Sequence, residues 1–245
     1  MPPDVRDLTH IAILLDVDGT ILDIAPTPAS VAVPTSLQRA LSAVSERVGG
    51  ALALVSGRPV PDLDRMFAPL RLPAIGGHGA ELRLNGGPVQ CRAEPLDAEL
   101  RDELTAIAAR HAGVFVEDKG YSIALHYRNA PGHGLSVVHE VKHACAACGG
   151  VELLSGKAVI EVKAKGFDKG IAVRELMAHP PFRGRAPIFI GDDRTDEAAF
   201  AVMPEFSGQA ISVGRKIAGA ADRFETPSDV RRWLERLSDG VVTSP

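Results

Sequence analysis

Short uninterrupted apolar runs alternate along the chain with segments in which apolar residues recur every three or four positions. The runs predict strands buried on both faces, because no polar residue alternates within them. They are IAILL (11–15), ALALV (51–55), APIFI (186–190) and AISV (210–213). Helical spacing occupies 36–48, 169–179 and 228–237, the last with Ser228 as its expected N-cap. Strands that alternate with helices predict a doubly wound α/β fold on a parallel sheet.

The middle of the chain has a different pattern. Segments 116–130 and 157–165 alternate apolar and polar residues, as half-exposed antiparallel strands do. Segments 97–112 and 135–150 have the spacing of helices. We therefore expect an inserted smaller α+β domain at 84–165, between the two parts of an α/β core at 1–83 and 166–245.

Composition excludes several classes of protein. Of the 245 residues, 45% are hydrophobic and 24% charged, with a net charge of -4, which is typical of a globular protein. No basic excess suggests a nucleic-acid partner, and no run of about 18 apolar residues suggests a membrane span. Three cysteines are too few for a disulfide framework, so a cytoplasmic location is the expectation. Nothing in the sequence calls for an obligatory protein partner.

The first strand ends on two carboxylates. Asp16 follows the run 11–15 directly, and Asp18 comes two positions later. Two such groups repel each other unless a cation neutralises them, and Mg²⁺ is the natural partner of hard oxygen ligands. Gly19 allows a sharp turn, and Thr20 offers a hydroxyl and a backbone N–H to an anion.

Two further strands end in polar groups of complementary chemistry. The run 186–190 leads into GDDRTDE (191–197), and the run 51–55 leads into a hydroxyl and backbone donors suited to a phosphoryl oxygen. Lys169 opens a helix, where a cation matches the helix dipole poorly, so we expect it to reach an anion. Each feature alone is common loop chemistry, but together they indicate a site for a phosphate and a divalent cation at the carboxyl edge of the sheet. The residues in question are Ser56, Gly57, Arg58, Asp192, Asp193 and Asp196.

This set of motifs resembles the haloacid dehalogenase superfamily of phosphohydrolases. DVDGT (16–20) is similar to its first motif, Ser56 to its second, Lys169 to its third and GDDRTDE to its fourth. The resemblance implies that Asp16 is the nucleophile and that Asp18 is the general acid and base. It implies Mg²⁺ on Asp16, the Asp18 backbone oxygen and Asp192, with Asp193 and Asp196 supporting the metal waters and Lys169. Phosphoryl contacts would come from Thr20, Ser56, Gly57, Arg58 and Lys169.

The inserted block falls between the second and third motifs, as it does in superfamily members with the larger α/β cap. Over most of its length the chain is similar to the trehalose-6-phosphate phosphatase family, in blocks such as GGHGAELR (76–83), DKGYSIALHYRNAP (118–131) and GKAVIEVKAKGFDKG (156–170). The resemblance implies hydrolysis of trehalose 6-phosphate through an aspartyl-phosphate. Phosphatases of the sucrose-6-phosphate or mannosyl-phosphoglycerate type share the same core and a similar cap, and they stay open as alternatives.

Polar positions in the inserted block suit a sugar. Glu161 and Lys163 alternate with apolar residues and so share one face of a strand, and we expect the same of His126 and Arg128 on a neighbouring strand. Carboxylate and ammonium groups accept from and donate to sugar hydroxyls. By resemblance, the sugar contacts are Lys119, His126, Arg128, Lys157, Glu161 and Lys163, with His78 near the reacting group. The alternative is a solvated strand face with ordinary ion pairs.

A competing metal signal lies at 139–143, where the sequence reads HEVKH, the HExxH pattern of zinc metalloproteases. Cys145 and Cys148 follow as a second possible pair of ligands. The extended form of the pattern is absent, since Ala146 and Gly149 stand where it requires Gly and His. A zinc protease or a structural metal site is therefore a distant alternative. A sensor that binds a sugar phosphate without turnover is also a distant alternative. Such a protein would be expected to have lost Asp16 or Asp18, and both are present.

Overall fold

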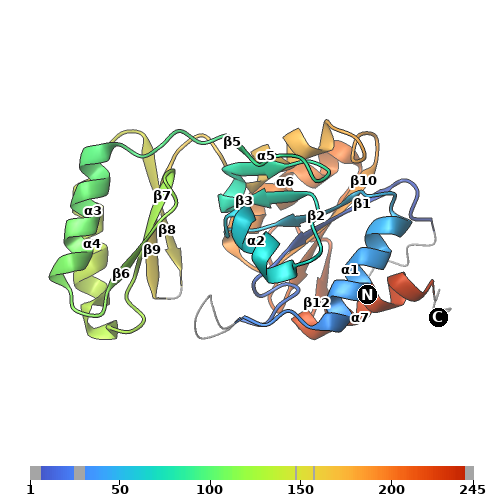
Figure 1. Ribbon diagram of the computed structural model, residues 1–245, viewed down its shortest axis with the longest axis horizontal. Coiled ribbons are helices and arrows are strands. Elements are labelled where there is room, and N and C mark those ends of the chain that lie inside the picture. The colour runs from blue at the N-terminus through green and yellow to red at the C-terminus, as the bar shows by residue number, and fades with distance from the viewer. Residues whose placement is uncertain (1–6, 25–30, 147, 157, 241–245) are drawn as a thin grey trace. The chain divides into compact units, whose positions relative to one another are not determined.

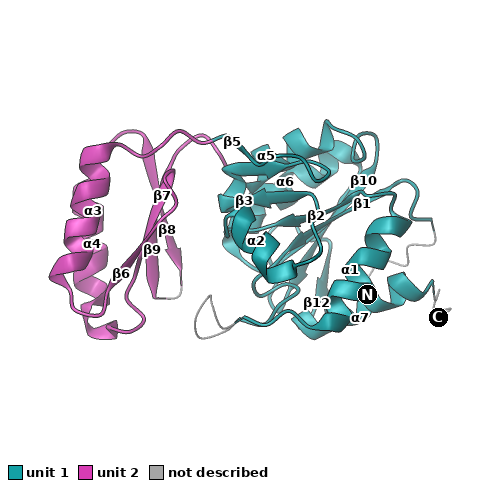
Figure 2. Cartoon of the chain, in the orientation of Figure 1, with its two compact units in different colours: residues 1–92, 168–245 teal, residues 93–167 magenta. Residues whose placement is uncertain are grey.

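The computed structural model describes residues 7–24, 31–146, 148–156 and 158–240. The chain folds into two compact units (Figure 2). Unit 1 comprises residues 1–92 and 168–245, and unit 2 comprises residues 93–167. Each unit has a hydrophobic core of its own. No helix in the described ranges is both long and apolar enough to cross a membrane.

Unit 1 is built on one eight-stranded sheet of order β12-β11-β10-β1-β2-β3-β4-β5 (Figure 1). Its strands are β1 (Ile11–Asp16), β2 (Leu52–Val55), β3 (Ala74–Gly76), β4 (Glu81–Arg83), β5 (Gln90–Cys91), β10 (Ala186–Gly191), β11 (Gln209–Val213) and β12 (Asp222–Phe224). The strands from β12 to β3 are parallel, and β4 and β5 extend the sheet in antiparallel pairing. The four apolar runs of the sequence are central strands, as expected for strands covered on both faces.

Helices lie on both faces of this sheet. They are α1 (Thr35–Arg47), α2 (Val60–Phe67), α5 (Lys169–Met177), α6 (Glu197–Val202) and α7 (Pro227–Asp239). In Figure 1, α1 lies beside α7 on one face, and α5 lies beside α6 on the other. Helix α7 begins earlier than expected, because Thr226 and Asp229 form a capping box and Ser228 lies inside the helix. The doubly wound parallel-sheet core is confirmed.

Unit 2 is a four-stranded antiparallel sheet of order β6-β7-β9-β8 with two helices. Its elements are α3 (Ala98–Arg110), β6 (Phe115–Asp118), β7 (Ser122–His126), α4 (Gly134–Cys145), β8 (Val151–Gly156) and β9 (Val159–Ala164). Figure 2 shows both helices on one face of the sheet. Alternate strand residues, among them Ile123, Leu125, Ile160 and Val162, form the core with the helices, so the other face carries the polar positions.

Two details of unit 2 differ from the sequence expectation. The alternating segment 116–130 is a hairpin rather than one strand, because the chain reverses at Gly120, whose φ is +83°. Strand β8, which the sequence pattern did not predict, precedes β9 and pairs with it along its whole length.

The start of the insert also differs from the expected position at residue 84. Gln90 and Cys91 pair with β4, and the Arg92 N–H donates to the Ala80 carbonyl. These bonds tie the segment 84–92 to the sheet of unit 1, and the compact unit 2 begins at Ala93. Four short 3₁₀ helices complete the described part of the chain: Gly77–Gly79, Pro131–His133, Arg194–Asp196 and Met203–Phe206.

Candidate active site

The carboxyl ends of two adjacent central strands bring three aspartates together. Asp16 is the last residue of β1, and β10 ends at Gly191, directly before Asp192. The two strands pair in parallel, so their ends meet at one edge of the sheet. Carboxylate oxygens of Asp16, Asp192 and Asp196 all lie within 4.8 Å of one another. Asp16 and Asp196 are buried, at 5% and 0% exposure.

Lys169 completes this cluster. Its Nζ donates to Asp16 Oδ1 at 2.8 Å and to Asp196 Oδ1 at 2.6 Å, in a fully buried arrangement. The lysine is the first residue of α5, and the Asp168 side chain caps that helix by accepting from the Ile171 N–H. The expected anion partner of Lys169 is therefore the pair of carboxylates in this structure. Burial acts to lower the pKa of Lys169, but Asp16 and Asp196 outweigh it and raise that pKa above its usual value.

The negative charges of the clustered carboxylates exceed the single positive charge of Lys169. Burial, with help from Asp196 and Asp192, raises the pKa of Asp16 well above its usual value against the opposing effect of Lys169. Burial and then Asp196 and Asp193 raise the pKa of Asp192 to about 6. A divalent cation would relieve this repulsion, and three carboxylates within 4.8 Å form a donor set of the hard oxygen type. These residues therefore fit a metal ion of the Mg²⁺ class.

The loop after β1 is shaped around Asp192. Thr20 is fully buried, and its Oγ1 donates to Asp192 Oδ1 at 3.0 Å, so the anion that this hydroxyl contacts in the structure is the Asp192 carboxylate. Gly19 has a φ of +89°, and a Cβ at that position would collide with the Asp192 carboxylate. A glycine is thus required both by the backbone conformation and by the close approach of the two loops.

Asp18 is held by Arg58. The guanidinium contacts both carboxylate oxygens, with Nε to Oδ2 at 2.6 Å and Nη2 to Oδ1 at 2.7 Å. Arg58 lies two positions after Ser56, which is buried directly after β2 and whose Oγ accepts from the Arg58 N–H at 3.1 Å. The sequence predicted Arg58 as a phosphate ligand, and its bidentate pairing with Asp18 was not foreseen. Arginine forks bind carboxylate and phosphate with the same geometry, so either partner suits this side chain.

His78 supports the loop that carries Ser56. Its backbone N–H donates to the Ser56 carbonyl at 3.0 Å, and its backbone is left-handed, with a φ of 56°. The imidazole ring lies so close to Gly57 that a Cβ there would collide with it. Burial acts to raise the pKa of Asp193, but the Lys169 ammonium and the hydrogen bonds from Thr195 hold that pKa below its usual value.

Hydrogen bonds within the fourth motif (191–197) hold its backbone in place. Asp196 Oδ2 accepts from the backbone N–H groups of Asp192 and Asp193, while Asp193 accepts from the Thr195 N–H and hydroxyl. Arg215, which no motif indicated, donates from Nε to the Asp192 carbonyl at 3.1 Å. Because the residue lies in the loop after β11 and this contact is to a backbone oxygen, no residue pattern in the sequence could have revealed it.

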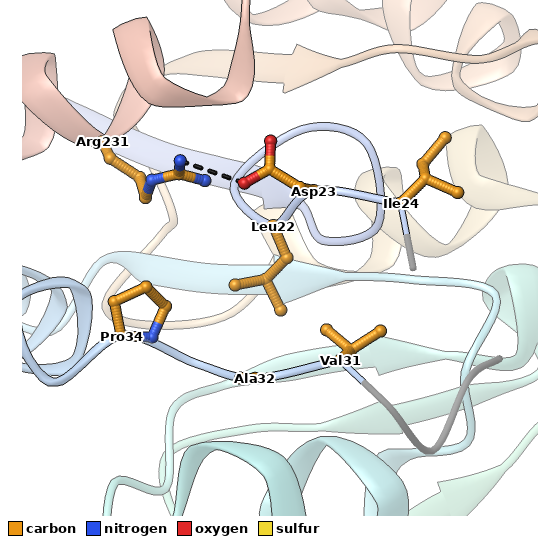
Figure 3. Close-up of a pocket in the computed structure, with 7 residues that line it drawn as sticks. All are labelled: Leu22, Asp23, Ile24, Val31, Ala32, Pro34 and Arg231. Atoms are coloured by element: carbon orange, nitrogen blue, oxygen red, sulfur yellow. Dashed lines mark hydrogen bonds and ion pairs between the residues drawn. The ribbon is translucent and has the colours of Figure 1, made fainter. Parts of the chain in front are cut away.

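Arg231 of helix α7 contacts the segment that follows the first motif (16–20), as Figure 3 shows. Arg231 donates to the Ile21 carbonyl at 3.0 Å and to Asp23 Oδ2 at 3.1 Å. Beside this contact lies a hollow of about 190 Å³. Its lining consists of Leu22, Asp23, Ile24, Val31, Ala32, Pro34 and Arg231, so the carboxylates of Asp16 and Asp192 do not line it.

A connected set of polar side chains lies on the face of the unit 2 sheet that α3 and α4 leave uncovered. Glu161 accepts from Ser122 Oγ at 2.6 Å and from Lys119 Nζ at 3.1 Å. His126 Nε2 lies 3.0 Å from Glu117 Oε2, and Lys119 Nζ lies 3.8 Å from Glu117 Oε1. The sequence predicted Lys119, His126 and Glu161, whereas Glu117 and Ser122 were missed because each also fits an ordinary solvated strand.

Three other predicted residues of unit 2 have different surroundings. Lys163 is buried, with Nζ 2.5 Å from the Phe167 carbonyl, 3.8 Å from the centre of the Phe167 ring and paired with Glu152. Arg128 does not share a strand face with His126, because β7 ends at His126 and Arg128 lies exposed in the following turn. Lys157 lies outside the described residues.

The HExxH segment does not assemble a metal site in this structure. His139 and His143 are exposed on α4, and Glu140 points instead to Arg110 and His111. Burial raises the pKa of the Cys145 thiol to about 11, which disfavours the thiolate that a metal requires. Among residues 7–24, 31–146, 148–156 and 158–240, the aspartate cluster is the one group of three or more ligand-type side chains with metal-binding spacing.

Comparison with known sequences identifies related enzymes. The sequence profile of the trehalose-phosphatase family matches residues 14–226. A probable trehalose-phosphate phosphatase of Sinorhizobium fredii is 42% identical over 224 residues, which cover 91% of this chain and 84% of that protein. The trehalose-6-phosphate phosphatase of Escherichia coli is 37% identical over 229 residues, which cover 92% of this chain and 86% of that protein.

Solved structures show the same fold. The C-terminal domain of a Candida albicans trehalose-6-phosphate phosphatase superposes with a TM-score of 0.83 at 23% identity, and the match covers 97% of this chain and 95% of that one. The similarity extends over unit 1 and unit 2 alike, since so little of the chain is left unmatched.

Proposed function

Since the chain belongs to the trehalose-phosphatase family of the haloacid dehalogenase superfamily, and is thus a phosphoric monoester hydrolase, we propose that it hydrolyses trehalose 6-phosphate to trehalose and phosphate. The observation that carries the proposal is the buried contact of Asp16 with Lys169 beside Asp192, at the carboxyl edge of the sheet. Such a contact opposes the effect of burial on the pKa of Asp16 and orients the Asp16 side chain in a buried site.

Asp16 is the proposed nucleophile. One of its carboxylate oxygens attacks phosphorus, the bond from phosphorus to the sugar oxygen breaks, and an aspartyl-phosphate forms. Asp18 gives its proton to the departing sugar oxygen. Asp18 then takes a proton from a water molecule that attacks the phosphorus of the aspartyl-phosphate, which releases phosphate and restores Asp16. Lys169, 2.8 Å from Asp16, keeps that side chain in place throughout.

Phosphate binding falls to the groups at the ends of β1 and β2. In our proposal Ser56, the Gly57 N–H, the Thr20 backbone N–H and Lys169 contact the phosphoryl oxygens. Arg58 joins them by exchanging the Asp18 carboxylate for the phosphoryl group, two partners of the same fork geometry. The exchange would release Asp18 for proton transfer at the moment when substrate arrives.

The proposed metal is Mg²⁺, held by Asp16, the Asp18 backbone oxygen and Asp192. When bound, it supplies positive charge that offsets the repulsion between the nucleophile and the phosphoryl oxygens. The chain contributes the orientation of the ligands: Thr20 holds Asp192, and Asp196 holds the backbone of the fourth motif. Asp193 and Asp196 would bind the metal waters or Lys169 as supporting residues.

Unit 2 is proposed to recognise the sugar. The chemistry of Glu161, Lys119 and His126 supports this role, because each presents a charged or polar group that pairs with hydroxyls. Arg128, Lys157 and Lys163 complete the proposed set of unit 2. Within unit 1, His78 beside Ser56 is proposed as a substrate contact near the reacting group.

Phosphate release from a panel of sugar phosphates in the presence of Mg²⁺ tests the proposal. The panel contains trehalose 6-phosphate, sucrose 6-phosphate, mannosyl-3-phosphoglycerate and glucose 6-phosphate. We expect kcat/KM for trehalose 6-phosphate to exceed the others by at least about 100-fold, which is a transition-state discrimination of about 3 kcal/mol. A clear preference for another sugar phosphate would overturn the substrate assignment, and no release from any would overturn the reaction.

A further inference from the structure

One aromatic side chain of unit 2, Phe115, lies outside its hydrophobic core. Phe115 opens β6 and is 47% exposed, although Val116 beside it packs against the core. Strand alternation puts Phe115 on the same face as Glu117, and the register puts it opposite His126 of β7. The ring therefore lies on the polar face of the sheet and not under α3 and α4.

The ring is held in a defined orientation. The Phe115 and His126 rings are stacked, with centroids 4.6 Å apart and planes within 5° of parallel. The His126 ring is fixed in turn by the 3.0 Å contact between its Nε2 and the Glu117 carboxylate. One face of the phenyl ring is thus covered by the imidazole. Its exposure of 47% shows that much of the rest remains open.

Hydrogen-bonding groups continue from this stack along the same face. Glu117 lies next to Lys119, Lys119 contacts Glu161, and Glu161 accepts from Ser122. Acceptors and donors therefore alternate beside an exposed aromatic surface. A pyranose ring has the matching chemistry, because its C–H groups present an apolar face and its rim carries hydroxyls.

We propose that Phe115, backed by His126, is the stacking platform for a pyranose ring of the substrate. The carboxylate and ammonium groups of Glu117, Lys119 and Glu161 bind the hydroxyls of that ring. The inference rests on the proposed function, which it deepens by naming a specificity-determining residue that no motif indicated. It also defines the substrate class as a glycoside phosphate, since a small phosphate ester has no ring to stack.

The test compares Phe115→Ala, Phe115→Tyr and the parent on trehalose 6-phosphate and on acetyl phosphate. Leu135→Ala serves as the matched control, because Leu135 is an apolar residue of unit 2 with 89% exposure on α4. We expect Phe115→Ala to lower the ratio of kcat/KM for trehalose 6-phosphate to that for acetyl phosphate about tenfold, mainly through KM, as loss of one aromatic contact would. Phe115→Tyr keeps the ring and should stay within about threefold of the parent, as should Leu135→Ala.

Two results would overturn the platform: an unchanged ratio for Phe115→Ala, or an equal fall for Phe115→Ala and Leu135→Ala. Thermal unfolding of each variant separates a loss of binding from a loss of folding. If the parent does not hydrolyse trehalose 6-phosphate, the proposed function fails by itself. The platform is then judged by the same ratio on the best sugar phosphate of the panel, where an unchanged ratio would refute it as well.

Discussion

At the scale of single residues, the site is dominated by negative charge in a small volume. Asp16, Asp192 and Asp196 have carboxylate oxygens within 4.8 Å of one another, and Lys169 supplies one positive charge to them. The raised pKa of Asp192, about 6, shows that a proton already competes for this carboxylate. A divalent cation and a proton are therefore alternative ways to relieve the same repulsion.

Asp192→Asn removes one of these charges with almost no change in volume. In metal-free protein at pH 7 we expect its melting temperature to equal or exceed that of the parent, by about 2–4 °C for each kcal/mol of repulsion relieved. Mg²⁺ should raise the melting temperature of the parent and leave that of the variant nearly unchanged. An equal rise in both proteins would show that Asp192 is not a metal ligand.

The pH dependence of the metal-free parent has a defined sign. The pKa of Asp192 is raised from 3.8 to about 6, so the folded state binds the proton more tightly than the unfolded state does. This contribution to stability is present at low pH and is lost as pH rises through about 6. The stabilisation by Mg²⁺ should change in the opposite direction and weaken as pH falls below about 6, as measured by melting temperature against pH.

At the scale of elements, helix starts and strand ends decide where the reacting groups lie. Lys169 is the first residue of α5, and the helix is fixed there by the Asp168 cap. The Asp168 carbonyl also lies so close to Gly79 that a Cβ on Gly79 would collide with it. The position of the lysine thus depends on a cap and a close backbone contact, as well as on its own ion pairs.

Asp168→Ala should therefore act on stability and on activity together. Loss of the cap costs about 0.5–2 kcal/mol of unfolding free energy. We expect kcat to fall several-fold, because the cap no longer holds the backbone of Lys169 at the start of α5. Asp168→Ser keeps a hydroxyl acceptor and should restore most of both quantities in urea unfolding and steady-state kinetics. A full loss of kcat in Asp168→Ser would indicate that the Asp168 carboxylate has a chemical role beyond capping.

Elements with a continuous apolar run or a clear helical period were predictable from the sequence, and elements that depend on tertiary contacts were not. The central strands carry continuous apolar runs, and α1 has its expected buried face of Leu37, Leu41 and Val44. The two-residue strand β5 and the three-residue strands β3, β4 and β12 are too short for any period to be recognised. The hairpin at Gly120 was missed because alternation continues on both sides of the turn.

The same distinction applies to the site. The positions of Asp16, Asp192, Lys169 and Ser56 in the fold were predictable, because each residue lies at or directly after the end of a recognisable strand, or at the start of a helix. The pairing of Arg58 with Asp18 depends on the meeting of two loops 40 positions apart, and no local pattern encodes it. The stack of Phe115 on His126 likewise depends on strand register.

At the scale of the whole molecule, the chain consists of two units with separate cores. The core of unit 2 is formed by Leu100, Leu104, Ile107, Val137, Val141, Ile160 and Val162 with their neighbours. Its sheet is complete within residues 93–167. We expect this segment, expressed alone, to unfold cooperatively on heating, with a modest melting temperature because small domains bury little surface. A featureless melt by circular dichroism would show that unit 2 requires unit 1 to fold.

The most direct measurement of the central claim is to trap the phosphorylated aspartate. Acetyl phosphate needs no proton on its leaving group, so Asp18→Asn should accept a phosphoryl group from it and then fail to activate water. Mass spectrometry of this variant should show one added phosphoryl group on the peptide that contains Asp16, and Asp16→Asn should show none. A phosphoryl group on any other residue, or steady turnover by Asp16→Asn, would contradict the assignment of Asp16 as the nucleophile.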